Sequence, residues 1–146
     1  MAIINPYINF NGNSEEAFTF YKSVFGGEFA MIVRFKDMPN PEAPLSDKEA
    51  NKIMHIALPI GKENVLMATD FLESQGHKMI EGNRYSLSIN AQSRDEADQI
   101  FNGLTVGGKI EVPIAESPWG SYFGLFQDKF GIQWMVDFDP NYNKEV

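Results

Sequence analysis

His55 is the side chain in this sequence best suited to acid–base chemistry. The chain has two histidines and no cysteine, which excludes thiol nucleophiles, disulfides and iron–sulfur ligation. An imidazole titrates near neutral pH and can also contact a ligand directly, so His55 is a candidate for either role. A histidine that is hydrogen-bonded within a sheet is an equally good interpretation. His77 lies in a polar segment, and we interpret it as a solvated loop residue.

A few other side chains have the chemistry to contact a ligand. Arg84 can pair with a carboxylate or a phosphonate, although a solvated or salt-bridged arginine is the commoner arrangement. Trp119 stands in a turn-like Ser-Pro-Trp-Gly segment, and we predict that it lines a pocket or an interface. Asp137 and Asp139 form a possible metal-ligand pair, but their position before a proline is more typical of a solvated strand end.

The motifs of several large enzyme classes are missing. The sequence has no Gly-x-Ser-x-Gly elbow and no Gly-x-Gly-x-x-Gly turn, which argues against a serine hydrolase and against dinucleotide binding. Gly103 to Lys109 imitates a phosphate-binding loop. However, Ile110 stands where that loop needs Ser or Thr, and the segment ends a helix instead of opening one. We therefore set this match aside.

Composition describes one acidic domain with a substantial core. The 146 residues are 43% hydrophobic and include twelve Phe, five Tyr and two Trp. Twelve basic against twenty acidic residues give a net charge of −8, so nucleic acid and anionic membranes are poor partners. No apolar run approaches the roughly 20 residues of a membrane span, and the N-terminus does not resemble a signal peptide. We expect a soluble, cytoplasmic protein.

An internal duplication organises the chain. Asn13 and Ser93 lie 80 residues apart, and each is followed three positions later by a glutamate, Glu16 or Glu96. This spacing predicts two amphipathic helices that each begin with a reciprocal capping pair. Each helix runs into a pair of glycines, Gly26-Gly27 or Gly107-Gly108. The agreement of caps, period and terminators indicates two copies of one unit.

Period-two alternation predicts one strand before each helix and three after it. The first strands are expected over Ile4–Phe10 and Arg84–Ile89. The other strands are expected over Glu28–Phe35, Met54–Ile60, Val65–Thr69, Lys109–Ala115, Ser121–Gln127 and Gln133–Asp137. The sequence thus predicts an α+β fold of two βαβββ modules, about residues 1–71 and about 84–140, joined by a linker at about 72–83. The proline-rich segment Asp37–Lys52 falls outside the pattern and is expected to be a flap or an interface arm with a short helical turn.

The polar faces of the two predicted sheets identify a cleft. If each helix covers the apolar side of its own sheet, the other side of the first strands is polar. It then presents Asn5, Tyr7, Asn9, Arg84, Ser86 and Ser88. By the same alternation, His55 and Ala57 point to this side, whereas the apolar residues between and beside them point towards the helix.

Paired modules of this kind around an open cleft resemble the vicinal oxygen chelate superfamily, which groups glyoxalase I, bleomycin-resistance proteins and ring-cleaving dioxygenases. Three segments look more narrowly like its PhnB-like branch: Pro6–Asn13 with Phe20-Tyr21, Met54–Ala57, and the most specific one, Asp128–Met135. The resemblance extends from Ile3 to Asp137. Members of this branch often carry a demethylubiquinone methyltransferase label, which these segments do not by themselves support.

The resemblance also implies where a metal would bind. Metalloenzymes of the superfamily place one ligand, usually His, Gln or Glu, on the first and last strand of each module. Here those four places fall on Asn5 (or Pro6), Met67, Arg84 and Met135. Divalent metals prefer carboxylate or imidazole donors, and a cationic arginine repels them. We therefore expect neither the usual metal site nor another cofactor.

We expect a metal-free protein that holds a small, partly apolar molecule in the cleft. The predicted pocket consists of Asn5, Tyr7, His55, Met67, Arg84, Trp119 and Met135. The alternative is a lyase, isomerase or dioxygenase-like enzyme. It would use either an unusual metal set such as His55 with Asp70, or His55 as a base with Arg84 stabilising an anionic ligand. By resemblance we also expect a homodimer, because clefts of this fold commonly form at dimer interfaces.

Overall fold

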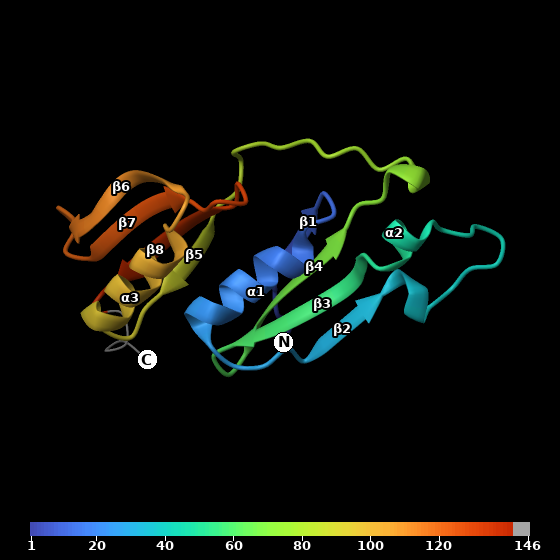
Figure 1. The fold of residues 1–146 in the computed structure, drawn as a ribbon. Helices are drawn as coiled ribbons and strands as arrows, with labels where there is room; N and C mark the ends of the chain where they lie inside the picture. The colour runs from blue at the N-terminus through green and yellow to red at the C-terminus, as the bar shows by residue number, and fades with distance from the viewer. Residues whose placement is uncertain (142–146) are drawn as a thin grey trace. The chain divides into compact units, whose positions relative to one another are not determined.

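The computed structural model describes residues 1–141 and divides the chain into two compact units (Figure 1). The first unit is Met1–Glu81, and the second begins at Gly82. This boundary lies inside the linker predicted at about 72–83. Among the described residues, no helix combines the length and the apolar character needed to cross a membrane.

The first unit is a four-stranded sheet with one long helix on one face. Its elements are β1 (Tyr7–Phe10), α1 (Ser14–Phe25), β2 (Met31–Arg34), β3 (Ile53–Ile60) and β4 (Asn64–Asp70). The strand order is β1-β4-β3-β2, in which β1 pairs parallel with β4 and the other pairs are antiparallel. Helix α1 packs on β3 and β4.

The second unit repeats this arrangement. Its elements are β5 (Leu87–Asn90), α3 (Arg94–Leu104), β6 (Lys109–Glu116), β7 (Tyr122–Gln127) and β8 (Gln133–Phe138). The order β5-β8-β7-β6 and the pairing directions match those of the first sheet, and α3 packs on β7 and β8. The structure confirms the predicted α+β fold of two βαβββ modules.

Each module buries the apolar side of its sheet beneath its helix. The side chains that are buried in the first unit include Phe10, Ala17, Phe18, Tyr21, Ile56, Leu58, Leu66 and Ala68. Those buried in the second include Ala97, Phe101, Leu104, Phe126, Trp134 and Val136. Both sets come from alternate strand positions and from one stripe of each helix, which is the pattern that the sequence predicts.

Gly124 brings α3 unusually close to the second sheet. A Cβ atom at this position would lie 2.7 Å from Cε2 of Phe101 and 3.0 Å from Cα of Ile114. Gly124 pairs with the buried Val136 in the middle of the sheet. The Phe101 ring of α3 therefore packs directly on the Gly124 backbone, and a larger residue at position 124 would require the helix or the neighbouring strand to shift.

The two long helices begin differently, which corrects one prediction. In α3, the Ser93 hydroxyl accepts a hydrogen bond from the Glu96 backbone N–H at 3.0 Å, as expected. In α1, the Asn13 side chain makes no capping hydrogen bond. Asp70, which is 2% exposed at the end of β4, takes this role instead. Its carboxylate accepts from the N–H of Ser14 at 3.0 Å and from the N–H of Ile53 at 2.8 Å.

The first strand of each module is shorter than predicted. Strand β5 begins at Leu87, which pairs with Trp134, so Arg84 and Tyr85 would lie beside the β7–β8 turn, ahead of the first residue of β8. The prediction that placed Arg84 in a strand is therefore wrong. Strand β1 begins at Tyr7, because Pro6 has no N–H to donate and Asn5 bonds through its side chain. Strand β2 likewise begins at Met31 and not at residue 28.

Asp128 organises the segment Asp128–Met135, which carries the most specific part of the family resemblance. Its carboxylate Oδ1 accepts from the N–H groups of Phe130 at 2.8 Å and Ile132 at 3.0 Å. Oδ2 accepts from the indole Nε1 of Trp134 at 2.8 Å. The segment thus forms the β7–β8 turn and fixes the buried indole beneath α3.

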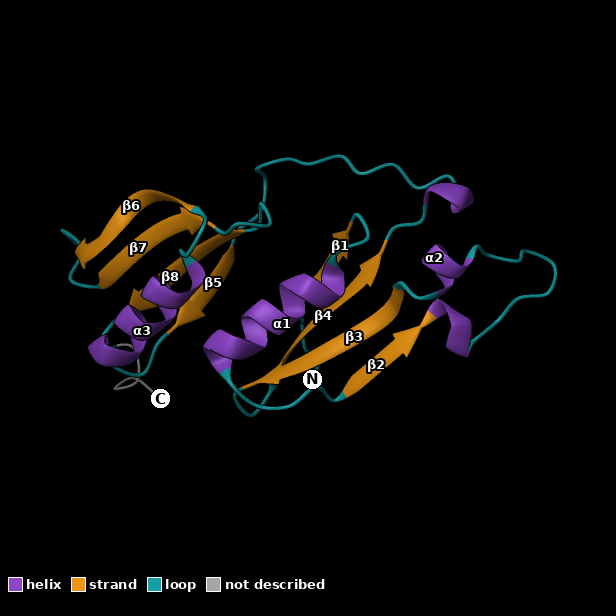
Figure 2. Ribbon diagram, in the orientation of Figure 1, coloured by secondary structure: helices purple, strands orange, loops and turns teal. Residues whose placement is uncertain are grey.

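An arm, residues 35–52, connects β2 to β3 (Figure 2). It contains a 3-10 turn, η1 (Phe35–Asp37), and the short helix α2 (Asp47–Ala50). The Ser46 hydroxyl accepts from the Glu49 N–H at 3.2 Å, which confirms the helical turn predicted there. A second 3-10 turn, η2 (Glu73–Gln75), follows β4.

Candidate functional site

The helix-free side of the first sheet gathers side chains from four strands. In the register, Tyr7 pairs with Met67, Met67 with Ala57, and Ala57 with Met31, so these four share one side. Alternation adds Asn9, Val33, His55 and Thr69. We call these eight residues the open face. The prediction that His55 and Ala57 lie with Tyr7 and Asn9, opposite the helix, is consistent with this register.

Tyr7 and His55 form a pair on the open face. The Tyr7 hydroxyl lies 3.2 Å from Nδ1 of His55, and the ring centroids are 5.7 Å apart at an interplanar angle of 33°. Within residues 1–141, Nε2 of His55 makes no hydrogen bond. The bond to Tyr7 fits the interpretation of a histidine that is hydrogen-bonded within the sheet, and the unbonded Nε2 is compatible with contact to a ligand.

The surroundings of this pair are mostly apolar and carry no formal charge. Met31, Val33, Ala57 and Met67 contribute aliphatic or thioether surface. The Thr69 hydroxyl is already used, since it donates to the carbonyl of Met54 at 2.7 Å. None of the eight open-face residues is Asp, Glu, Lys or Arg. The imidazole, the phenol and the exposed Asn9 amide are therefore the main polar groups that a ligand on this face would meet.

The structure brings only part of the predicted pocket together. Tyr7, His55 and Met67 share the open face, while the Asn5 amide oxygen accepts from the Val65 N–H at 3.0 Å and secures the start of β1. The remaining three predicted residues, Arg84, Trp119 and Met135, belong to the second unit.

Within the second unit these three residues have different surroundings. Met135 pairs with Ser88 and Leu125 on the helix-free side of the second sheet, in a position equivalent to that of Met67. Trp119 is 69% exposed in its turn and contacts the Phe123 ring edge-on, with centroids 5.5 Å apart. Arg84 is exposed ahead of β5.

The donor set does not fit a metal. The four positions that would hold one carry an amide, two thioethers and a guanidinium, and none of them carries a carboxylate or an imidazole. The set of His55 with Asp70 is wrong, because Asp70 lies with Ala68 on the helix side and its carboxylate accepts two backbone N–H groups. Among residues 1–141, no cluster of three or more histidines and carboxylates has a metal-binding arrangement.

A polar cluster beside α3 was not predicted. The Tyr122 hydroxyl donates to Asp98 at 2.5 Å, and Arg94 lies 4.4 Å from the Tyr122 ring while it forms an ion pair with Glu116. The hydrogen bond to Asp98, aided by burial, raises the pKa of Tyr122 above its ordinary value of 10.0. Arg94 and Asp98 lie one turn apart on the helix, so this cluster braces α3 against β6 and β7.

Comparison with known proteins gives a consistent family assignment. Residues 2–137 match the family model described as 3-demethylubiquinone-9 3-methyltransferase. The crystal structure of protein PA1353 from Pseudomonas aeruginosa is 36% identical, with a TM-score of 0.83 over 95% of this chain and 98% of that one. A PhnB protein from Bacillus cereus is 25% identical, with a TM-score of 0.73 over 94% and 99%.

A more distant structure shows the wider fold. A glyoxalase/bleomycin resistance protein/dioxygenase family enzyme from Burkholderia phytofirmans PsJN is 14% identical, with a TM-score of 0.58 over 90% of this chain and 95% of that one. At that identity the similarity concerns the fold alone. The chain therefore belongs to the PhnB-like family described as 3-demethylubiquinone-9 3-methyltransferase, built on the glyoxalase-like vicinal oxygen chelate fold.

Proposed function

We propose that this protein binds a small, largely apolar molecule on the open face of its first sheet and that it does so without a metal. The observation that carries the proposal is the Tyr7–His55 hydrogen bond, which stands among uncharged side chains on the side of the sheet that the helix leaves uncovered. Binding sites of this kind combine apolar surface with a few oriented polar groups.

The pair is suited to orient one polar group of a ligand. Nδ1 of His55 is occupied by Tyr7, so Nε2 is the ring nitrogen left to meet an oxygen or nitrogen of the bound molecule. Met31 and Met67 have flexible, polarisable side chains that adapt to a flat or irregular ligand. Methyl transfer fits this face less well, because none of its eight residues is a carboxylate that could pair with a cationic methyl donor.

The same geometry favours one alternative, an enzyme in which His55 is a general base. In such an enzyme the Nδ1–H of His55 would donate to the Tyr7 oxygen, which holds the ring and leaves the lone pair on Nε2 to take the proton.

We also propose that two copies associate. Several large side chains lie exposed in the single chain, among them Tyr7 at 47%, Met31 at 50% and Tyr85 at 82%. Tyr7 and Met31 lie on one face of the first sheet, and a contiguous exposed apolar patch marks an interaction site. Light scattering should give twice the 16.5 kDa chain mass, and a monomeric mass at micromolar concentration would contradict this association.

Native mass spectrometry and metal analysis of the purified protein test the binding proposal. We expect a co-purifying small molecule whose occupancy falls in His55→Ala and in Tyr7→Phe but not in the matched control His77→Ala. Stoichiometric nickel, zinc, manganese or iron, retained without added metal, would overturn the metal-free proposal. Turnover that needs His55 in a metal-free preparation would favour the enzyme instead.

A further inference from the structure

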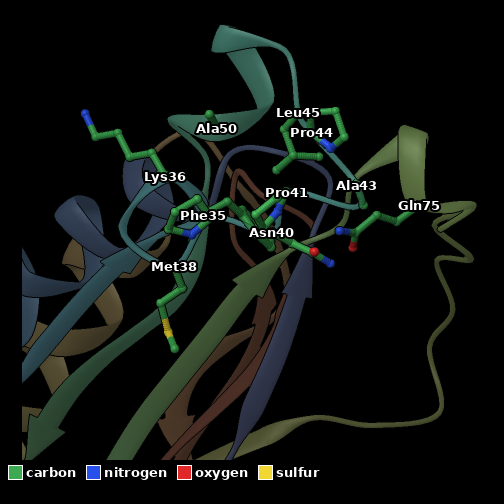
Figure 3. A pocket seen from close by; sticks show the side chains of 11 residues that line it. Phe35, Lys36, Met38, Asn40, Pro41, Ala43, Pro44, Leu45, Ala50 and Gln75 are labelled. Carbon is green, nitrogen blue, oxygen red and sulfur yellow. The ribbon is translucent and has the colours of Figure 1, made fainter.

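A cavity is lined by the arm, and its lining includes none of the eight open-face residues (Figure 3). Its volume is about 370 Å³, within the range of small-molecule pockets. Most of its lining is apolar and comes from the arm, including Phe35, Pro39, Pro41, Pro44 and Leu45, while Gln75 of η2 closes one side. We call this cavity the arm pocket.

The wall of the arm pocket is built to hold its shape. Its three prolines restrict the backbone of the loop. Between them, the Asn40 side chain accepts from the Glu42 N–H at 3.0 Å and the Asn40 carbonyl accepts from the Ala43 N–H at 3.1 Å. These bonds hold the turn in one conformation, so binding would not carry the entropy cost of ordering the loop.

Both stems of the arm are also secured. The guanidinium of Arg34 donates to the Asn51 carbonyl at 2.9 Å, and Lys36 donates to the Asn51 side chain at 3.0 Å. On the far side, the carboxylate of Glu49 accepts from the Ser74 N–H at 3.3 Å. This last bond holds η2 against the arm and thereby places Gln75 at the pocket.

The polar groups around the cavity define the ligand's charge. Lys36 is the only charged residue of the lining, and its ammonium group is bonded to Asn51 and extends away from the cavity in Figure 3. A charged ligand would therefore lose hydration without gaining a partner. The Gln75 side chain extends towards the cavity and makes no hydrogen bond within residues 1–141. It offers one donor group and one acceptor oxygen to a ligand.

We propose that the arm pocket binds a neutral, ring-containing apolar molecule that forms one hydrogen bond with Gln75, independently of the open face. The apolar walls take the ring, the size limits the ligand to a small molecule, and the amide fixes its orientation. This site is additional to the function proposed above and does not depend on it.

N-phenyl-1-naphthylamine is a suitable probe, because it is neutral, aromatic and carries a single N–H. In protein labelled at the alanine methyl groups, Ala43 and Ala50 report on the arm pocket and Ala57 reports on the open face. Titration should shift the Ala43 and Ala50 signals saturably, whether or not the Ala57 signal also moves. Shifts confined to Ala57, or no shift of any of the three signals, would overturn the proposal.

Variants make the test specific. Ala43 is exposed, so Ala43→Phe fills the pocket without a burden on the core and should weaken binding at least about 10-fold. Gln75→Leu keeps the side-chain size and should weaken binding roughly 3- to 10-fold through the lost hydrogen bond. Ala2→Phe, outside every element, is the control for added aromatic surface. Unchanged affinity in both pocket variants would contradict the assignment even if the alanine signals moved.

Discussion

Tyr7 of β1 and His55 of β3 make their hydrogen bond across an intervening strand. The two strands do not touch, because β4 lies between them in the order β1-β4-β3, yet the hydroxyl reaches Nδ1 at 3.2 Å. The pair therefore spans β4, on which Met67 pairs with Tyr7. A ligand on this face would therefore contact a hydrogen-bonded Tyr7–His55 pair and not two independent side chains.

Removal of the Tyr7 hydroxyl should abolish the preference of the neutral His55 ring for one tautomer. When the hydroxyl donates to Nδ1, the proton of the neutral imidazole stays on Nε2. Nitrogen-15 shifts of the two ring nitrogens, measured with the imidazole neutral, should show this form in the unmodified protein and a mixture in Tyr7→Phe. His77 is the internal control, because its Nδ1 accepts from the Leu72 N–H at 3.2 Å in both proteins. An unchanged His55 spectrum would mean that the pair does not set the tautomer.

Asp70→Ala should be among the most destabilising single substitutions in the first unit. It leaves two buried N–H groups without their charged acceptor, which should lower the free energy of unfolding by roughly 3 kcal/mol. Urea denaturation measures this difference. Asn13→Ala is the control and should change the free energy by less than about 0.5 kcal/mol, because the Asn13 side chain caps nothing. The reverse ranking would show that Asn13 and not Asp70 stabilises the start of α1.

Gly124→Ala should strain the second unit. The added methyl group would lie 2.7 Å from the Phe101 ring and 3.0 Å from the Ile114 backbone, so the helix must shift. We expect the free energy of unfolding to fall by about 1 to 3 kcal/mol, as in other overpacked cores. The matched substitution Gly82→Ala meets no atom within 4 Å and should be nearly neutral in the same thermal or urea experiment. Equal stability of the two variants would contradict the close approach.

Stability should decline in alkali partly through Tyr122. Its folded-state pKa is raised above 10.0 by the bond to Asp98, so the stabilisation is complete below pH 10 and disappears as the pH rises through the folded-state pKa. The free energy of unfolding of the unmodified protein should therefore fall more between pH 9 and about 11 than that of Tyr122→Phe. Tyr85→Phe removes an exposed phenol and should follow the unmodified protein. Parallel profiles for all three proteins would exclude a contribution from Tyr122.

The sequence predicted the elements well because their signals are local. Alternation identified β3, β7 and β8 to within a residue or two, and Ser93 with Glu96 identified the start of α3. Strand ends were less accurate, because the start of β5 depends on where β8 begins.

Strand alternation predicted which side of the sheet the site residues lie on, but not which of them are in contact. Parity placed Tyr7 and His55 on one side, but their contact depends on the strand order and could not be predicted. The arm pocket was missed for a related reason, since its shape comes from turns and from a bond between Glu49 and Ser74 that are 25 residues apart. Contacts between residues so far apart produce no periodic pattern of residue types from which they could be predicted.

The two helix starts have a consequence for how the repeats fold. In the first turn of α3, the Glu96 N–H donates to the side chain of Ser93, three residues earlier. In α1, the Ser14 N–H donates instead to the carboxylate of Asp70, which lies 56 residues further along the chain. A local cap forms as soon as the helix does, while the distant one requires β4 to dock first. Pulse-labelled hydrogen exchange during refolding should therefore protect the amides of α3 before those of α1, and simultaneous protection would contradict this order. Two copies of one architecture would thus acquire their helices at different times, the C-terminal copy first.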